Sequence, residues 1–155
     1  MRVPRMRPAE EFRYLVLAAQ REGNRLLGQA LKPLGVTSSQ AEVLRLLQDR
    51  QPLTLSGLGD LLVCESGNSP SRLVERLVQA GLVRRQTLEH DRRHIELTLS
   101  QEGQELARRI AAIEDDLYAA IDALDADLEP AMAALRAFVR DLPSGQALAR
   151  RVGDA

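Results

Sequence analysis

The sequence has little cysteine and few aromatic residues. Its 155 residues include one cysteine, no tryptophan and 3% aromatics, so a core must consist mainly of Leu, Val, Ile and Ala. The lone Cys64 excludes an intramolecular disulfide framework and indicates a reducing, cytoplasmic location. No uncharged apolar run approaches the roughly 18 residues of a membrane span. No apolar stretch follows the basic start at 1–8, so we expect neither a membrane segment nor a secretory signal.

The sequence also lacks motifs for catalysis and cofactor binding. It has no nucleophile motif, phosphate-binding glycine loop or dinucleotide fingerprint. Asp115 and Asp116 would point to different faces of a helix, which makes them a poor catalytic pair. His90 and His94 flank a turn and have no third ligand nearby in sequence. We therefore expect no enzymatic activity, no catalytic residues, no metal site and no cofactor.

Charge is unevenly distributed although the net charge is −1. Residues 66–100 carry six basic and four acidic side chains, whereas residues 101–155 carry six basic and eleven acidic ones. One acidic run in the second segment contains no basic residue, and its members are Glu114, Asp115, Asp116, Asp122, Asp125, Asp127 and Glu129. Phosphate would repel this run, so we expect it to lie far from any bound DNA, unless it is only a solvated helix face.

Apolar periodicity predicts three helices in the first part of the chain. The first spans 9–33, and a capping box at Thr37-Ser38-Ser39-Gln40 begins the second. Thr54 is the expected N-cap of a short third helix that continues through Leu62. The inward side chains of that helix are expected to be Leu55, Leu58, Leu61 and Leu62.

A fourth helix is predicted after a turn over 63–69. Ser69 is its expected N-cap, Pro70 its first residue and Gly81 its end. The buried stripe of this helix is expected to be Leu73, Val74 and Leu77.

The apolar period changes from 3.6 to 2 after the fourth helix, which predicts a β-hairpin. Residues 82–88 form one strand, 89–93 a polar turn and 94–99 the returning strand. One face of the returning strand carries Ile95, Leu97 and Leu99.

Two further helices are predicted after the hairpin. Ser100 caps a long one, and Pro130 begins a last one that Pro143-Ser144-Gly145 ends before a short tail. The long helix carries an apolar seam at Leu106, Ile110, Ile113, Leu117, Ile121, Leu124 and Leu128.

The order of elements is that of a winged helix-turn-helix protein: mainly α, with a small two-stranded β-wing. In such proteins the helix after the turn lies in the major groove, where its N-terminal side chains reach base edges. The alternative is that the polar face of this helix is an ordinary solvated surface. The candidate DNA-binding residues here are Asn68, Ser69, Ser71, Arg72 and Arg76.

The hairpin tip adds a second candidate contact. Arg92 and Arg93 are expected in an exposed turn, and an arginine on a projecting hairpin fits a narrow, electronegative minor groove. Asp91 is placed to orient the Arg93 guanidinium through an ion pair. The alternative is a surface ion pair that contributes little.

The apolar seams of the terminal helices predict a homodimer. A single chain with so few aromatics would leave both seams exposed, and pairing each helix with its symmetry mate would bury them. A twofold dimer also presents two reading helices about one DNA turn apart. The alternative is a monomer whose two long helices fold back on each other.

The chain resembles the MarR family of bacterial transcriptional regulators over nearly its whole length. The matching motifs are Gly35-Val36-Thr37-Ser38-Ser39-Gln40 with Val43-Leu44, Ser71-Arg72-Leu73-Val74-Glu75-Arg76-Leu77, Gly81-Leu82-Val83, and the wing signature Asp91-Arg92-Arg93 followed by Leu97-Thr98-Leu99-Ser100 and Gly103.

This resemblance implies a triangular homodimer on pseudo-palindromic DNA, with Arg93 in the minor groove and Asp91 orienting it. It implies one domain over 1–155, in which 1–36 and 101–155 dimerise and 37–100 bind DNA. Members are often repressors released by a small phenolic or acidic ligand that binds between the two lobes. The ligand-binding residues are not predicted.

Two features depart from the family pattern. Pro70 stands where the family more often has a residue other than proline. Its ring and missing N–H affect how the helix begins, and therefore which side chain can reach a base. The family's peroxide sensors have a reactive cysteine near the start of the first long helix, and this chain has none there. Cys64 is either a small residue in a turn or a thiol with a lowered pKa that senses oxidants.

The sequence therefore predicts a DNA-binding transcriptional regulator whose partners are double-stranded DNA, a second copy of the chain and a small-molecule effector. A different class of function is a protein-interaction adaptor or antirepressor that uses a winged-helix dimer without binding DNA. The sequence pI of about 6.1 favours the adaptor, and the retained arginines favour DNA binding.

Overall fold

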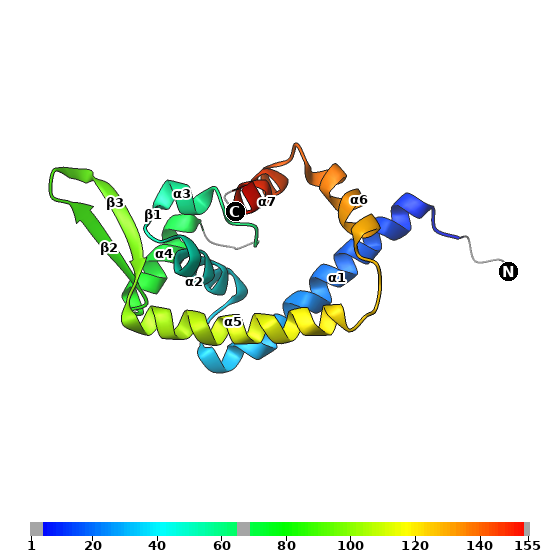
Figure 1. Ribbon diagram of the computed structural model, residues 1–155, viewed down its shortest axis with the longest axis horizontal. Coiled ribbons are helices and arrows are strands. Elements are labelled where there is room, and N and C mark those ends of the chain that lie inside the picture. Colours follow the sequence, from blue (N-terminus) through cyan, green and yellow to red (C-terminus); the bar gives the residue numbers. More distant parts are fainter. Residues whose placement is uncertain (1–4, 65–68, 154–155) are drawn as a thin grey trace.

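The computed structural model describes residues 5–64 and 69–153 of the chain. Helices dominate, and Figure 1 shows a hairpin that projects on the left from a helical body. No helix in the described residues is long and apolar enough to cross a membrane. The elements are α1 (Pro8–Leu31), the 3-10 turn η1 (Lys32–Leu34), α2 (Ser38–Arg50), β1 (Leu53–Thr54), α3 (Leu55–Gly59), α4 (Pro70–Gln79), β2 (Val83–Leu88), β3 (Asp91–Leu99), α5 (Gln101–Asp122), α6 (Glu129–Val139) and α7 (Pro143–Gly153).

Local capping chemistry sets the ends of the first helices. α1 has Pro8 in its first turn, where a missing N–H costs no helical hydrogen bond. The chain leaves η1 through Gly35, whose φ of 72° is left-handed and favours glycine. The capping box of α2 is confirmed: Thr37 Oγ1 accepts from Gln40 N at 3.2 Å, and Gln40 Oε1 accepts from Thr37 N at 3.0 Å.

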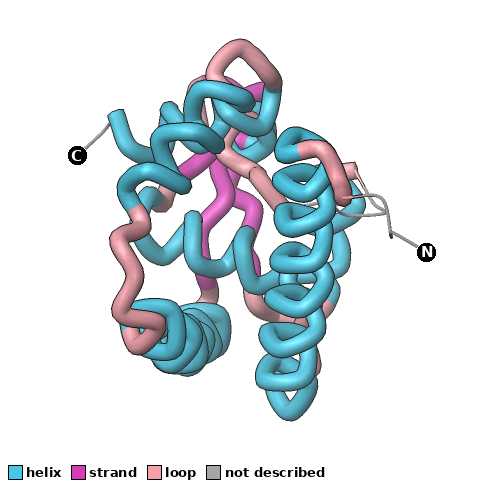
Figure 2. Tube along the Cα trace, turned by 90° about the vertical axis from the view of Figure 1, so that its right-hand side faces the viewer, coloured by secondary structure: helices cyan, strands magenta, loops and turns pink. Residues whose placement is uncertain are grey.

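The sheet has three antiparallel strands in the order β1-β3-β2. The wing predicted from sequence is confirmed as β2 and β3, and β1 pairs with the other edge of β3 in the register Leu53 with Leu97. β1 was not predicted because two residues are too few to show a period of 2. Figure 2 shows the strands (magenta) among the helices (cyan) that make up most of the chain.

The core lies where α2, α4, α5 and the base of the sheet meet. Ile110 of α5 and Leu77 of α4 are 0% and 1% exposed. The prediction that Leu55 faces inward is wrong, because Leu55 is exposed at the start of α3, and α3 ends at Gly59 and not at Leu62. Ile95 shares one face of β3 with the buried Leu97 and Leu99, as predicted, but it is exposed because it lies on the projecting part of the hairpin. The largest fully buried side chains are Leu31, Leu44, Leu47, Leu58, Leu77, Leu97, Ile110 and Val43.

Polar contacts fix the base of the wing to α5. Ser100 caps α5 by accepting from Gly103 N at 3.0 Å, and its hydroxyl donates to the Gly81 carbonyl at 2.6 Å. The amide of Ser100 donates to the Leu82 carbonyl at 3.0 Å. Gly103 is required at this contact because a Cβ there would lie 2.0 Å from the Leu82 carbonyl oxygen.

The C-terminal segment is the helix α7, so the prediction that Pro143-Ser144-Gly145 ends the last helix before a short tail is wrong. The preceding helix α6 ends at Val139, and Pro143 begins α7, because proline is well tolerated in a first helical turn. Figure 1 shows α6 and α7 leading from the far end of α5 back toward α3. Ala147 is buried there, and Arg150 Nη1 donates to the Asp60 carbonyl at 3.1 Å.

Much of the apolar surface of the terminal helices is uncovered in the single chain. α1 has one buried residue, Leu31, and α6 has none. The apolar seam of α5 is buried at Ile110 but exposed at Ile121, beyond which α5 ends. The exposed large apolar side chains of α1 and α6 include Phe12, Leu15, Val16, Leu26, Met132, Leu135 and Phe138.

Candidate nucleic-acid interface

The start of α4 follows the prediction. Ser69 is the N-cap and Pro70 is in the first turn, and Ser69 Oγ accepts from Arg72 N at 3.4 Å. Pro70 therefore begins a regular helix instead of distorting one. Asn68 lies outside the described residues.

α4 has one buried and one free face. Leu73, Val74 and Leu77 are buried as predicted, at 4%, 2% and 1% exposure, so packing fixes the rotation of the helix. The opposite face is open to solvent along its polar side chains. Those exposed candidates are Ser69, Ser71, Arg72 and Arg76.

The wing arginines lie in a strand, not in the turn predicted at 89–93. The turn is Glu89-His90, and β3 begins at Asp91, which is opposite Leu88. The register shifts before the next pair, Thr87 with Ile95, so the three intervening residues of β3 form a bulge. A bulge redirects side chains, and both wing arginines in it, Arg92 and Arg93, are exposed.

Asp91 contacts the backbone of Arg93. Its Oδ1 accepts from Arg93 N at 3.0 Å, a local turn that aspartate favours. An Asp91–Arg93 ion pair was expected, but none occurs among the ion pairs of the described residues. Asp91 thus shapes the backbone that carries Arg93 and leaves the guanidinium free to reach a partner.

Two arginines of β2 were not singled out from the sequence. Arg85 pairs with Glu75 and so ties the wing to α4, while its neighbour Arg84 is exposed. The signal was a run of four polar residues in the strand, from Arg84 to Thr87, all of which are exposed. With these residues, the exposed arginines of α4 and the wing are Arg72, Arg76, Arg84, Arg85, Arg92 and Arg93.

The acidic run lies away from the wing. It begins with Glu114 in the second half of α5, and Figure 1 shows that this end of α5 is opposite the end joined to the hairpin. Glu114 Oε2 accepts from Arg45 Nε at 2.9 Å. Burial lowers the pKa of Arg45, but the hydrogen bond and charge of Glu114 outweigh burial and raise it.

Cys64 is not an activated thiol. Partial burial, with the charge of Glu42 and a hydrogen bond to it, raises the pKa of Cys64 to about 11, contrary to a lowered pKa. A raised pKa keeps the group protonated at neutral pH, and the thiolate is the reactive form. His94 Nε2 lies 3.2 Å from Glu96 Oε1, and residues 5–64 and 69–153 contain no group of three or more potential metal ligands.

A helix with an exposed polar face, followed by an arginine-bearing hairpin, defines a winged helix-turn-helix protein. Residues 36–95, which contain α4, β2 and the first part of β3, match the family model described as the MarR family. Over this segment the chain is similar to the MarR family.

Known proteins and structures are similar to a larger part of the chain. The organic hydroperoxide resistance transcriptional regulator of Bacillus subtilis (strain 168) is 26% identical over 137 residues, which are 88% of this chain and 92% of the relative. The structure of S. aureus MepR in complex with DNA has a TM-score of 0.75 at 21% identity and covers 89% of this chain and 100% of that one. A MarR-like transcription regulator from Bacillus cereus ATCC 10987 has a TM-score of 0.71 at 16% identity, with coverages of 85% and 96%.

Proposed function

We propose that the protein is a transcriptional regulator that binds DNA as a homodimer and represses transcription until a small phenolic or acidic ligand releases it. The observation that carries the proposal is the exposed polar face of α4 beside the arginine bulge of β3. The MepR structure supports it, because that protein shares the fold and is bound to DNA. Retardation of a DNA fragment from upstream of the protein's own gene tests the proposal, and failure to bind at low salt would favour an adaptor.

The proposed contacts divide between the two DNA grooves. Ser69, Ser71 and Arg72, with Asn68, read base edges from the start of α4 in the major groove, and Arg76 contacts phosphate one turn on. The bulge presents the exposed Arg92 and Arg93 to the minor groove, where electronegative potential attracts arginine. Asp91 acts through the backbone of the bulge.

We propose that the terminal helices form the dimer interface, so that 1–36 and 101–155 dimerise while 37–100 bind DNA. The exposed apolar side chains of α1 and α6 support this division, because many large apolar side chains exposed on a single chain are typical of a protein contact. Two winged helices related by a twofold axis match a pseudo-palindromic site.

Introducing a charge on α6 should prevent dimerisation. Phe138 is 70% exposed, so Phe138→Asp leaves the fold of one chain intact but places an unpaired carboxylate in the proposed interface. Analytical ultracentrifugation should show a dimer for the wild type and mainly a monomer for Phe138→Asp. Ile95→Asp makes the same kind of change on the wing, at a residue 44% exposed, and should remain a dimer. A monomeric wild type would contradict this interface.

A cavity of about 400 Å³ is the proposed effector site. It lies between α2 and α5, where Arg45, Glu114 and Tyr118 line it, and Arg151 of α7 contributes a second cation. Both arginines already pair with carboxylates, Arg45 with Glu114 and Arg151 with Glu42, each at 2.9 Å. An acidic ligand would replace one of these partners, and Tyr118 would offer its ring and hydroxyl to a phenol.

Benzoate should therefore stabilise the protein more than benzyl alcohol, which has a similar ring but no charge. At about ten times its Kd, benzoate would raise the stability by about 1.4 kcal/mol and the melting temperature by about 3 °C. Differential scanning fluorimetry measures this shift, and Arg45→Gln should reduce it. Equal shifts for the two compounds would show that the cavity does not select an anion.

A further inference from the structure

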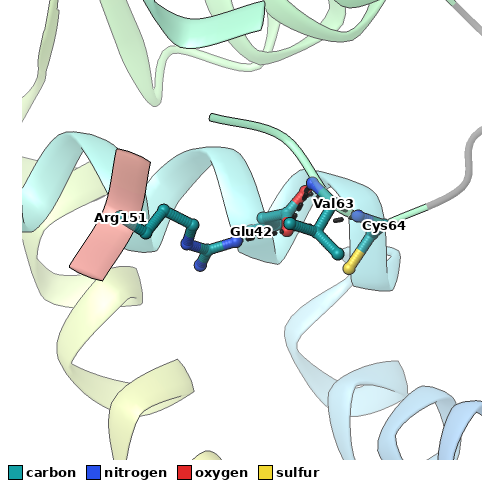
Figure 3. Close-up of polar contacts among 4 residues, drawn as sticks. All are labelled: Glu42, Val63, Cys64 and Arg151. Carbon is teal, nitrogen blue, oxygen red and sulfur yellow. Dashed lines mark hydrogen bonds and ion pairs between the residues drawn. The ribbon is translucent and has the colours of Figure 1, made fainter. Parts of the chain in front are cut away.

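A nearly buried carboxylate joins three parts of the chain that are distant in sequence. The side chain of Glu42, on α2, is 6% exposed. Its two oxygens accept from the backbone N–H groups of Val63 and Cys64 at 3.0–3.2 Å, and Oε2 also accepts from Arg151 Nη1 at 2.9 Å (Figure 3). Arg151 lies on α7, so the C-terminal helix contacts the carboxylate that holds the chain after α3.

Arg151 supplies the charge that makes this arrangement favourable. A buried carboxylate is costly unless it is paired and hydrogen-bonded, and Arg151 is the only cation that pairs with Glu42 within the described chain. The end of α7 is held by two more contacts: Arg50 Nη2 donates to the Arg151 carbonyl at 2.6 Å, and Arg150 donates to Asp60. If α7 left this position, Glu42 would lose its counterion.

The two amides held by Glu42 lie just before the proposed reading helix. Four residues separate Cys64 from Ser69, the N-cap of α4. Four residues span a limited distance, at most about 3.3–3.6 Å each, so the position of Cys64 restricts where α4 begins. The start of α4 also packs on α3, since a Cβ at Gly59 would lie 3.7 Å from Pro70 Cγ.

We propose that α7 is a latch: Arg151 holds Glu42 in the position that fixes Val63 and Cys64, and this docked state is the one that binds DNA. Release of α7 frees the chain before α4 and lowers DNA affinity. Arg151 and Glu42 both line the cavity, so an acidic ligand that takes Arg151 from Glu42 opens the latch. The effect of α7 on DNA affinity rests on the proposed DNA binding. The docking of α7 on Glu42 through Arg151 does not depend on it.

Cys64 reports on the latch directly. The positive charge of Arg151 lowers the pKa of Cys64, so its loss alone would raise that pKa and slow the reaction of the thiol. Release of the chain from Glu42 acts in the opposite direction, because it removes the nearby carboxylate and the desolvation that raise the pKa of the exposed Cys64. Arg151→Ala should therefore increase the rate of alkylation of Cys64 by N-ethylmaleimide about tenfold, the effect of lowering a thiol pKa by about one unit.

The control is Arg140→Ala, which removes the same charge from the exposed end of α6 and should leave the rate unchanged. In a Glu42→Gln background, Arg151→Ala should add little, because Arg151 acts through the carboxylate. Arg151→Lys keeps the charge and should retain most of the protection if Arg151→Ala does not fold. An unchanged or slower rate in folded Arg151→Ala, or an equal acceleration in both backgrounds, would overturn the latch.

DNA affinity separates the latch from the proposed function. Arg151→Ala should bind DNA at least tenfold more weakly than the wild type, because each chain of the dimer loses a charged hydrogen bond. If the wild type binds no DNA but Arg151→Ala still accelerates alkylation, the latch stands and the proposed function fails. If the wild type binds DNA and the alkylation rate does not change, the latch alone fails.

Discussion

Arg93→Ala is expected to lower the affinity of the protein for its DNA site about a hundredfold. Each wing loses a minor-groove contact of about 1.4 kcal/mol, and a homodimer loses two of them. The guanidinium has no ion-pair partner among the described residues, and Asp91 binds only the backbone of Arg93, so the substitution should leave the fold intact. Fluorescence anisotropy with a labelled duplex measures the loss.

Arg108→Ala is the matched control for Arg93→Ala. Arg108 is an exposed arginine on α5 that pairs with Glu105, so its loss changes the net charge by the same amount away from the wing. The expected loss of affinity is about threefold or less, the size of a long-range charge effect at physiological salt. Equal losses for the two variants would show that the wing does not contact DNA.

Gly103→Ala is expected to destabilise the protein by about 3 kcal/mol or more. Alanine normally stabilises a helix relative to glycine by about 1 kcal/mol, so the sign of the effect is informative. Here the added Cβ would lie 2.0 Å from the Leu82 carbonyl oxygen, and the start of α5 must move away from the wing. That movement would weaken the Ser100 contacts with Leu82 and Gly81. Urea unfolding followed by circular dichroism measures the change.

Gly59→Ala is the control for Gly103→Ala. A Cβ at Gly59 would make an ordinary contact with Pro70 Cγ at 3.7 Å, so the stability should change by about 1 kcal/mol or less. If Gly103→Ala were as stable as Gly59→Ala, the wing and α5 would not be joined through this close approach.

The elements that the sequence predicts well have both a period and a local end signal. α4 is such a case, because Ser69 and Pro70 mark its start and a stripe of three apolar residues repeats at helical spacing. β1 has only two residues, which is too short for a period. α7 was missed because Pro143 begins it, whereas a proline followed by serine and glycine was interpreted only as the end of a helix.

The sequence also predicts some features of the candidate site but not others. Exposure of Ser71, Arg72 and Arg76 follows from the buried stripe of α4, because a helix that buries one face exposes the other. The bulge that carries Arg93 depends on a register shift between strands, which no local pattern specifies.

The role of Glu42 was not predictable from its neighbours. Glu42 stands between Ala41 and Val43 in a buried part of α2, where a glutamate is unusual unless it has a specific partner. In the structure its side chain is 6% exposed. Its partners are 21, 22 and 109 positions away, so only the fold brings them together.

The most direct test of this account is the salt dependence of DNA binding by the wild-type protein. The fragment would be the region upstream of its own gene, and binding would be followed by gel retardation and anisotropy from about 50 to 200 mM salt. We predict a complex of two chains per duplex whose affinity falls steeply, with a log–log slope of about −4 or steeper if five or more phosphates are neutralised. No complex at the lowest salt, or binding that does not change with salt, would contradict DNA recognition and favour the adaptor.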